Sequence, residues 1–449
     1  MTAELEEIAA QVVRMALEGG ADDAECTVSA GEEFTAAIRM RQLERLKDAG
    51  SRAAGVRVMI GQHPGSAYTS DLTTEGLRRM VDSALELARI TSADPYAGLP
   101  ESGELGRVEG DLQLYFHDLA SVSAEARIQA ARKAEEAALA YDARIVNSEG
   151  ASVDSHLSHR AFANSRGFCA SYSGTRCSVS VVPVAKDGAS MERDYWFEQS
   201  RSAAALEHPD RVGRRAAERA IRRLKPRKVA TQKVPVVFEP EAARTLLDHI
   251  FEAVNGDAVY RNASFLAGKL GEKVASEKLT VIDDGTLPGL FGTAPFDDEG
   301  VPTRRTVVIE RGVLRSYLLN TYTARKLGLK TTGNASRGLT GNAGVGHGNL
   351  FAEPGRAAPQ ELIGGIRSGF YVTELIGFGV NTVTGEYSRG AAGLWIENGE
   401  LAYPVSEVTV SGNLRQMLEA IEAVANDLEF RTATASPTLL VGEMTVSGQ

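Results

Sequence analysis

The sequence predicts an α+β protein in two parts: an N-terminal domain that repeats one helix–strands–helix unit, and a C-terminal β-rich domain with an antiparallel sheet or barrel and helices. Three observations support this prediction. Amphipathic helical patterns alternate with short strand-like runs in the first half of the chain. Residues typical of hairpin turns punctuate the second half. A length of 449 residues exceeds what one hydrophobic core usually organises, so we expect domains at 1–228 and 229–449.

The two copies of the unit, roughly 1–95 and 120–228, have the same order of elements. In the first, an amphipathic helix over 1–20 precedes the strands, and Thr73 caps the closing helix. In the second, helices over 124–141 and 209–224 enclose the strands. The predicted strands are 24–30, 34–41, 55–61, 66–70, 143–147, 159–165, 168–173 and 178–184. Because an apolar sheet face must be covered, we expect helices to flank a sheet in each copy.

The last helix of the second copy is strongly basic. Nucleic-acid binding is one interpretation of this face. The other is a structural helix whose cations suit its C-terminal end, with Val212, Ala216, Ala220 and Leu224 packed inward. We favour the second and expect no nucleic-acid partner, because the net charge is -10 and no aromatic residues interleave the basic ones. The basic residues are Arg211, Arg214, Arg215, Arg219, Arg222, Arg223, Lys225, Arg227 and Lys228.

The C-terminal domain contains two predicted hairpins. Arg311-Gly312 separates two apolar runs, and Asn398-Gly399 is the residue pair that type I′ turns prefer. Short apolar runs at 234–238 and 279–283 are typical of buried strands. An antiparallel sheet or partly closed barrel follows. The glycine-rich stretches at 333–348 and 377–393 predict loops.

Composition indicates the compartment. The three cysteines, Cys26, Cys169 and Cys177, are few and odd in number, which is typical of a reducing environment rather than a disulfide scaffold. The first helix is amphipathic and does not resemble a signal peptide, and no apolar run approaches the length of a membrane span. We therefore expect a soluble cytoplasmic protein that does not interact with membranes.

The helix predicted over 241–254 carries Asp248, His249 and Glu252, which are the side-chain types of a metallopeptidase helix. A zinc helix needs two imidazoles about one turn apart, with a carboxylate beside the bound water. This helix offers one imidazole. Its apolar stripe indicates packing against a core, so a structural helix with a solvated polar edge is the competing interpretation. The stripe consists of Leu246, Leu247, Ile250, Phe251 and Val254.

Other candidate residues lack the spacing that their chemistry needs. His347 lies in a glycine-rich run without a phosphate-loop pattern, so a ligand contact is the most it suggests. Ser336 has no base placed beside it by the sequence. Two histidines three residues apart on one strand point to opposite faces, and no C-x-x-C pair accompanies them. The metal cluster weighed on this ground consists of His156, His159, Cys169 and Cys177.

Five segments between residues 146 and 393 resemble the TldD/PmbA peptidase family, and within it the PmbA branch, also called TldE; the match covers nearly the whole chain. They are 146–150 (VNSEG), 194–196 (DYW), 331–338 (TTGNASRG), 374–381 (ELIGFGVN) and 387–393 (YSRGAAG). In this family the TldD subunit is a zinc peptidase whose ligands are two histidines of an H-E-x-x-x-H helix and a cysteine near the C-terminus. Its TldE partner resembles it in fold and lacks the metal.

The resemblance can be carried over position by position. With Asn255-Gly256-Asp257 aligned to the segment after the TldD helix, the first histidine falls on Leu247, the glutamate on Asp248 and the second histidine on Glu252. His249 then lies at a non-ligand position. The segment 424–438, where the ligand cysteine is expected, contains none. The resemblance thus implies no catalytic, cofactor or metal residue in this chain, and zinc in a TldD-like partner.

Three functional hypotheses remain open. The leading one is a non-catalytic TldE/PmbA-type subunit of a TldD/TldE zinc protease that acts on unfolded peptides. For such complexes the resemblance implies maturation of a peptide antibiotic, degradation of flexible proteins and the old name "modulator of DNA gyrase". The second is an independent hydrolase that uses Asp248, His249 and Glu252. The third is a homodimeric regulatory binding protein.

Overall fold

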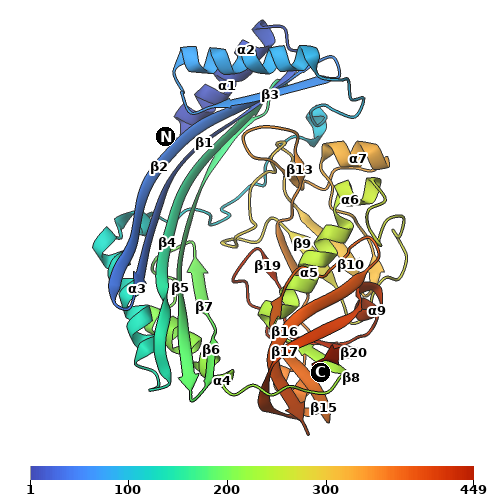
Figure 1. Ribbon diagram of the computed structural model, residues 1–449. Helices are drawn as coiled ribbons and strands as arrows, with labels where there is room; N and C mark the ends of the chain where they lie inside the picture. The colour runs from blue at the N-terminus through green and yellow to red at the C-terminus, as the bar shows by residue number, and fades with distance from the viewer. Residues whose placement is uncertain (1, 449) are drawn as a thin grey trace.

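The computed structural model describes residues 2–448 and confirms the α+β class (Figure 1). A long curved sheet forms the N-terminal half, and a barrel and a second sheet form the C-terminal half. Within the described residues, no helix is both long and apolar enough to cross a membrane.

The N-terminal sheet has seven strands in the order β3-β2-β1-β4-β5-β6, with β7 paired to β5. Two helices cover one end of the sheet and two cover the other (Figure 1). The strands are β1 (Asp23–Arg39), β2 (Gln42–Ile60), β3 (His63–Thr69), β4 (Ile145–Asn164), β5 (Cys169–Asp187), β6 (Ser190–Arg193) and β7 (Trp196–Ser200). The helices are α1 (Thr2–Glu18), α2 (Thr74–Ile90), α3 (Ala124–Leu139) and α4 (Pro209–Arg222), and two short 3-10 helices, η1 (Ser102–Glu104) and η2 (His117–Ser121), lie between α2 and α3.

The duplicated order of elements is confirmed, but the expectation of a sheet for each copy is wrong. The two copies share one sheet, because β1 pairs antiparallel with β4 from Glu25↔Asn164 to Ile38↔Ala151. The strands are also longer than predicted. The predicted run 24–30 and most of the run 34–41 fall in one strand, β1, which ends at Arg39 and has a partner on both sides. Residues 42–52 of β2 are exposed on both faces, so they show no apolar alternation that could have marked them as a strand.

Five strands of the C-terminal half close into a barrel in the order β17-β16-β15-β8-β20, and the ring is completed by pairing of β17 with β20. Most pairs are antiparallel, as predicted, and β8 with β15 is parallel. The barrel strands are β8 (Gln232–Phe238), β15 (Ser368–Ile376), β16 (Glu386–Glu397), β17 (Glu400–Asn413) and β20 (Leu439–Ser447), with β18 (Ile421–Val424) beside β20. The predicted loop over 377–393 is therefore partly wrong, since its second half begins β16.

A second sheet in the order β11-β10-β9-β14-β19 lies beside the barrel, and β12 pairs with β13 separately. The strands are β9 (Val281–Asp284), β10 (Arg305–Glu310), β11 (Val313–Leu314), β12 (Ala335–Ser336), β13 (Gly344–Val345), β14 (Asn349–Ala352) and β19 (Thr434–Ala435). The helices of this half are α5 (Pro240–Val254), α6 (Gly256–Tyr260), α7 (Thr321–Leu327), α8 (Pro359–Gly364) and α9 (Leu414–Glu419). The largest hydrophobic cluster lies here, with α5 packed into it.

Both predicted hairpins are confirmed. Arg311 and Gly312 have φ of 46° and 80°, and Asn398 and Gly399 have φ of 52° and 84°. Positive φ at both central residues is the requirement of a type I′ turn, which matches the twist of the flanking strands. These turns connect β10 to β11 and β16 to β17.

Candidate functional site

Helix α5 forms where the sequence predicts it. Pro240 occupies its first turn, where a missing N–H costs nothing, and Glu241 there opposes the positive end of the dipole. At the other end the Asn255 side chain accepts a hydrogen bond from the Asp257 amide and starts α6. The stripe Leu246, Leu247, Ile250 and Val254 is buried, and Phe251 packs against it. The helix is therefore a core element with one open edge.

The structure does not bring the predicted site residues of α5 together. Leu247 is 0% exposed and lies in the hydrophobic core. Asp248 faces Arg244 at 3.9 Å, and Glu252 faces His249 Nδ1 at 3.4 Å, so the two carboxylates pair with different neighbours. Positions 247 and 252 also differ in environment. One is buried and the other is about half exposed.

His249 is held mainly by packing. Its ring contacts the ring of Tyr387 edge to face, with 6.2 Å between centroids. Its Nε2 is buried and has no hydrogen-bond partner within the described residues, and the same holds for the Tyr387 hydroxyl. Burial raises the pKa of Tyr387 far above its ordinary value. Tyr387 is therefore a neutral phenol, and His249 contacts no carboxylate other than the exposed Glu252 within the described residues. The pair does not form an activated nucleophile with its base.

The residues at the positions that the resemblance assigns to the zinc ligands do not fit a zinc ion. The first position is an apolar leucine inside the core, and the second is a carboxylate that points to the helix edge. Across residues 2–448, no group of three or more His, Cys, Asp or Glu side chains is arranged to hold a metal ion. Zinc sites need three or four converging N, S or O ligands. We therefore derive no metal-dependent step for this chain.

The segment in which the resemblance places a ligand cysteine lies beside α5, where β19 packs on the helix. His347 bridges the two. Its ring contacts Phe251 edge to face at 4.8 Å, its Nδ1 donates to the Gly348 carbonyl, and its Nε2 lies 3.4 Å from the Thr434 hydroxyl. His347 thus packs the loop 333–348, which we call the glycine-rich loop from here on, against α5 and the segment 424–438.

The remaining candidates are dispersed. His159 hydrogen bonds to Ser173 at 2.7 Å, Cys177 donates to the Ser200 carbonyl, and Cys169 lies at the surface beside Glu6. Burial raises the pKa of Cys177 to about 11, so its thiol is protonated at neutral pH. His156 pairs in register with Arg176 of β5. Ser336 is exposed on β12, and no histidine of the described chain hydrogen bonds to it.

A buried cluster that the sequence did not predict joins the N-terminal sheet to the glycine-rich loop; we call it the Glu25 contact. Glu25 of β1 is 0% exposed and accepts from Arg57 of β2 at 2.8 Å and from Arg337 of the loop. Although burial raises it, the two guanidinium groups hold the pKa of Glu25 below its ordinary value. Gly55 makes the approach possible, because a Cβ there would lie 1.8 Å from the Leu339 carbonyl oxygen.

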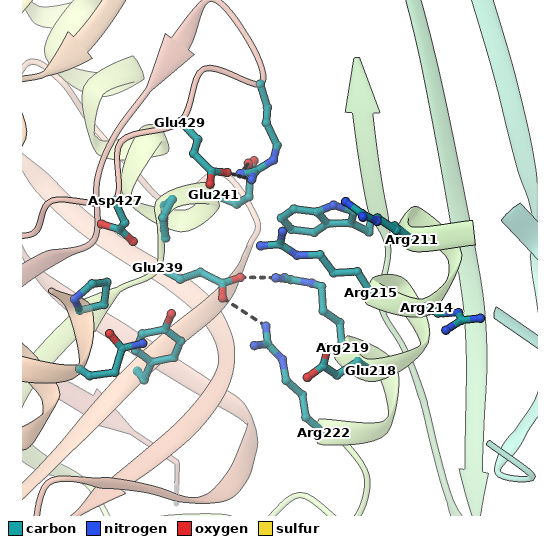
Figure 2. Close-up of a pocket in the computed structure, with 16 residues that line it drawn as sticks. Arg211, Arg214, Arg215, Glu218, Arg219, Arg222, Glu239, Glu241, Asp427 and Glu429 are labelled. Carbon is teal, nitrogen blue, oxygen red and sulfur yellow. Dashed lines mark hydrogen bonds and ion pairs between the residues drawn. The ribbon is translucent and has the colours of Figure 1, made fainter. Parts of the chain in front are cut away.

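A second junction, which we call the α4 contact, links α4 and β7 to the start of α5 (Figure 2). Arg219 lies between Asp194 at 3.3 Å and Glu239 at 2.7 Å, and Arg222 reaches Glu239 at 3.2 Å. Although burial lowers it, these carboxylates raise the pKa of Arg219. Trp196 lies under the guanidinium of Arg215 at 3.8 Å.

The inward packing predicted for α4 is confirmed, since Val212, Ala216, Ala220 and Leu224 are buried. Its arginines, however, are not simply solvated, because several face the C-terminal half. A cleft of about 770 Å³ lies between α4 on one side and the start of α5 with residues 427–431 on the other. Arg211, Arg214 and Arg215 line one wall, and Glu241, Asp427 and Glu429 line the other (Figure 2).

Two of the segments that carry the resemblance lie at these junctions. Asp194 and Trp196 of the DYW segment belong to the α4 contact, and Arg337 of the TTGNASRG segment belongs to the Glu25 contact. An arginine in a glycine-rich run was a usable signal. Its partner Glu25 lies 312 residues away, and no local pattern identifies it.

Three family models match the chain: PmbA/TldA metallopeptidase domain 1 over 24–88, the central domain over 117–224 and the C-terminal domain over 231–448. They define the scaffold as that of a metallopeptidase class. Among similar proteins, Metalloprotease PmbA of Escherichia coli O157:H7 is 40% identical and a PmbA homolog of Haemophilus influenzae is 35% identical, each over 99% of this chain and 96% of the relative.

Solved structures agree with this assignment. A candidate modulator of DNA gyrase from Bacteroides thetaiotaomicron superimposes with a TM-score of 0.92 at 29% identity, over 99% of both chains. TldE from Thermococcus kodakarensis shares the fold, with a TM-score of 0.88 at 22% identity over 98% of this chain and 100% of that one. The chain belongs to the PmbA/TldD family, in its PmbA or TldE branch.

Proposed function

We propose that this chain is the non-catalytic subunit of a cytoplasmic, two-subunit zinc protease, in which a TldD-like partner binds the metal and cleaves unfolded peptides. The observation that carries the proposal is Leu247, an apolar side chain buried in the core at the position of the first zinc ligand. Glu252 at the second position points away from it, and 424–438 contains no cysteine. The relatives named metalloprotease support proteolysis as the activity of the complex.

In this proposal the chain contributes binding surface rather than chemistry. An exposed strand edge can hold an extended peptide through main-chain hydrogen bonds with little sequence preference. Residues 42–52 of β2 lie at such an edge, because β3 covers only 54–60 of that strand. Maturation of a peptide antibiotic and degradation of flexible proteins are the processes we propose for the complete complex.

The test combines zinc analysis with cleavage of an unstructured peptide, on the chain alone and mixed with a TldD-like subunit. We expect neither zinc nor cleavage from the chain alone, and cleavage from the mixture. Stoichiometric zinc together with cleavage by the chain alone would refute the proposal. A chain that forms only homodimers and never binds the TldD-like subunit would favour a regulatory binding protein.

The contact between His249 and Glu252 supports one alternative, an independent hydrolase. Substitution of His249 by alanine would abolish such an activity. The matched control is Thr245→Ala, one turn earlier on the same helix, which should have no effect on it. Loss of peptide cleavage by the His249 variant, with no TldD-like subunit present, would establish the alternative.

A further inference from the structure

The cleft of the α4 contact has the size of a ligand site. Its volume of about 770 Å³ falls within the range of roughly 300–1,000 Å³ that is usual for bound ligands. Arginines of α4 form one wall, and the start of α5 with the 427–431 segment forms the other (Figure 2). Trp196, Pro240, Pro359 and Tyr371 add apolar surface. The site is therefore amphipathic and is shared by the two halves of the chain.

The carboxylates on the α5 side already have partners. Glu239 pairs with Arg219 and Arg222, as described above. Glu241 pairs with Arg244 at 3.0 Å. The other two are also satisfied: Asp427 accepts from the Thr438 amide and hydroxyl at 2.8 and 2.7 Å, and Glu429 pairs with Arg431. The carboxylates of this wall are therefore already paired or hydrogen bonded, and a bound cation would gain little from them.

The arginines on the α4 side are less well matched. Among residues 2–448, no carboxylate lies within 4 Å of Arg214 or Arg215. Arg211 reaches only Glu207, at 3.4 Å. Partial burial, together with the nearby Arg431 and Arg219, lowers the pKa of Arg215, although Glu198 and Glu207 act in the opposite direction. Glu218, also without an ion pair in the described chain, lies on the far side of Arg219 from Arg215 in Figure 2.

Arg215 is also held in place for recognition. Its guanidinium carbon lies over the indole of Trp196, 3.8 Å from the ring centroid, and this cation–π contact restrains the side chain. A planar guanidinium group matches the two oxygens of a carboxylate, and such bidentate pairs are among the strongest hydrogen bonds in proteins. A nucleic-acid strand fits less well than a single carboxylate, because its backbone carries a charge at every nucleotide, the opposite wall is acidic and the chain carries a net charge of -10.

We propose that this cleft binds a carboxylate of an extended peptide through Arg215, with Arg214 adding positive charge on the outer side of α4 and the neighbouring apolar surface in contact with the peptide chain (Figure 2). This inference rests on the proposed function and adds a substrate preference to it, for acidic segments or free C-termini. Both sources present the same carboxylate, and matched peptides distinguish them.

The test is fluorescence anisotropy of the full-length chain with a labelled, unstructured peptide that contains glutamates and a free C-terminus. We expect a glutamine-for-glutamate analogue or a C-terminal amide to bind at least about tenfold more weakly, which identifies the source. We expect Arg215→Gln to weaken binding of the parent peptide at least about fivefold, and Arg214→Gln to weaken it by a smaller factor, through loss of one positive charge near the cleft. Equal binding of the parent and both analogues would overturn the inference.

The control variant is Arg78→Gln, an exposed arginine of α2 outside the cleft, which should bind like the unmodified chain. Loss of the contact with Trp196 can perturb the folding of the Arg215→Gln variant. Arg214→Gln still tests the inference in that case, because Arg214 is exposed and has no ion pair within the described residues. Unchanged binding by the Arg214 variant and a folded Arg215 variant would also overturn the inference. Binding is measured without a partner, so its failure is distinct from failure of the protease proposal.

Discussion

The Glu25 contact and the α4 contact both join the N-terminal sheet to the C-terminal half through arginines and carboxylates. They differ in how far these charged side chains are buried from solvent. In the first, Glu25, Arg57 and Arg337 are almost completely buried, and both guanidinium groups are used on one carboxylate. In the second, Arg219 is buried while Arg214 and Arg215 are exposed and line an open cleft. The comparison indicates that the first contact fixes the two halves and the second leaves charge available for a ligand.

The largest effect is expected when the Glu25 contact is broken. Arg337→Met removes one of the two cations on a fully buried carboxylate, which we expect to lower the free energy of unfolding by about 3–5 kcal/mol. Urea unfolding measures this. Addition of Glu25→Gln to the variant should restore part of the loss, because it removes the unpaired charge. Arg305→Met, at an exposed position of β10, is the control, and an equal loss there would contradict the closed role of the contact.

A smaller effect is expected in the α4 contact. Arg219→Met leaves Asp194 and Glu239 with Arg223 and Arg222 as remaining partners, at 3.8 and 3.2 Å. We expect a loss of about 1–3 kcal/mol in the free energy of unfolding. The loss should shrink at high salt, since an open cleft admits counterions. If the loss exceeds that of Arg337→Met, the two contacts have been ranked in the wrong order.

Asp283, whose hydrogen bond with Asn334 supports the glycine-rich loop, should make the stability of the chain depend on pH. Asp283 accepts a hydrogen bond from Asn334, and burial raises its pKa to about 6. The unfolded value is about 3.9, so the folded state holds the proton more tightly. This stabilisation is complete below about pH 4 and is lost as pH rises through 6. In urea unfolding, we expect the free energy of unfolding of the unmodified chain to decline between about pH 4 and 7, and Asp283→Asn to make this decline smaller. An unchanged decline in the variant would exclude Asp283 as its source.

The smallest effect on stability is expected at the mouth of the cleft. Arg214→Gln should change the free energy of unfolding by less than about 0.5 kcal/mol, because the side chain is exposed and has no ion pair in the described part of the chain. Thermal unfolding at two salt concentrations measures this. A change as large as that of Arg219→Met would show that Arg214 belongs to the structural part of the contact.

Local features of the fold could be predicted from the sequence, and long-range ones could not. Apolar periodicity located α5, and turn chemistry located the hairpins at Arg311 and Asn398, because each pattern lies within a few residues. Pairing of β1 with β4, which merges the two copies into one sheet, joins segments more than 100 residues apart. Exposure of 42–52 on both faces hid the longest part of β2.

The candidate site shows the same division. Leu247 could be recognised as a buried core residue from its place in the apolar stripe. The partners of Glu25 and Arg219 could not, because ion pairs between distant elements leave no spacing in the sequence. The sequence did place the basic residues of α4 on one helix, yet it could not show that an acidic wall faces them.

We propose that cleavage belongs to a TldD-like partner subunit and not to this chain. The most direct measurement is peptide cleavage by the reconstituted pair, with substitutions made in one subunit at a time. We predict full activity when Asp248, His249 and Glu252 of this chain are all replaced by alanine, and no activity when one zinc-ligand histidine of the TldD-like subunit is replaced. Loss of activity on substitution of this chain's three residues, with the pair still assembled, would contradict the account.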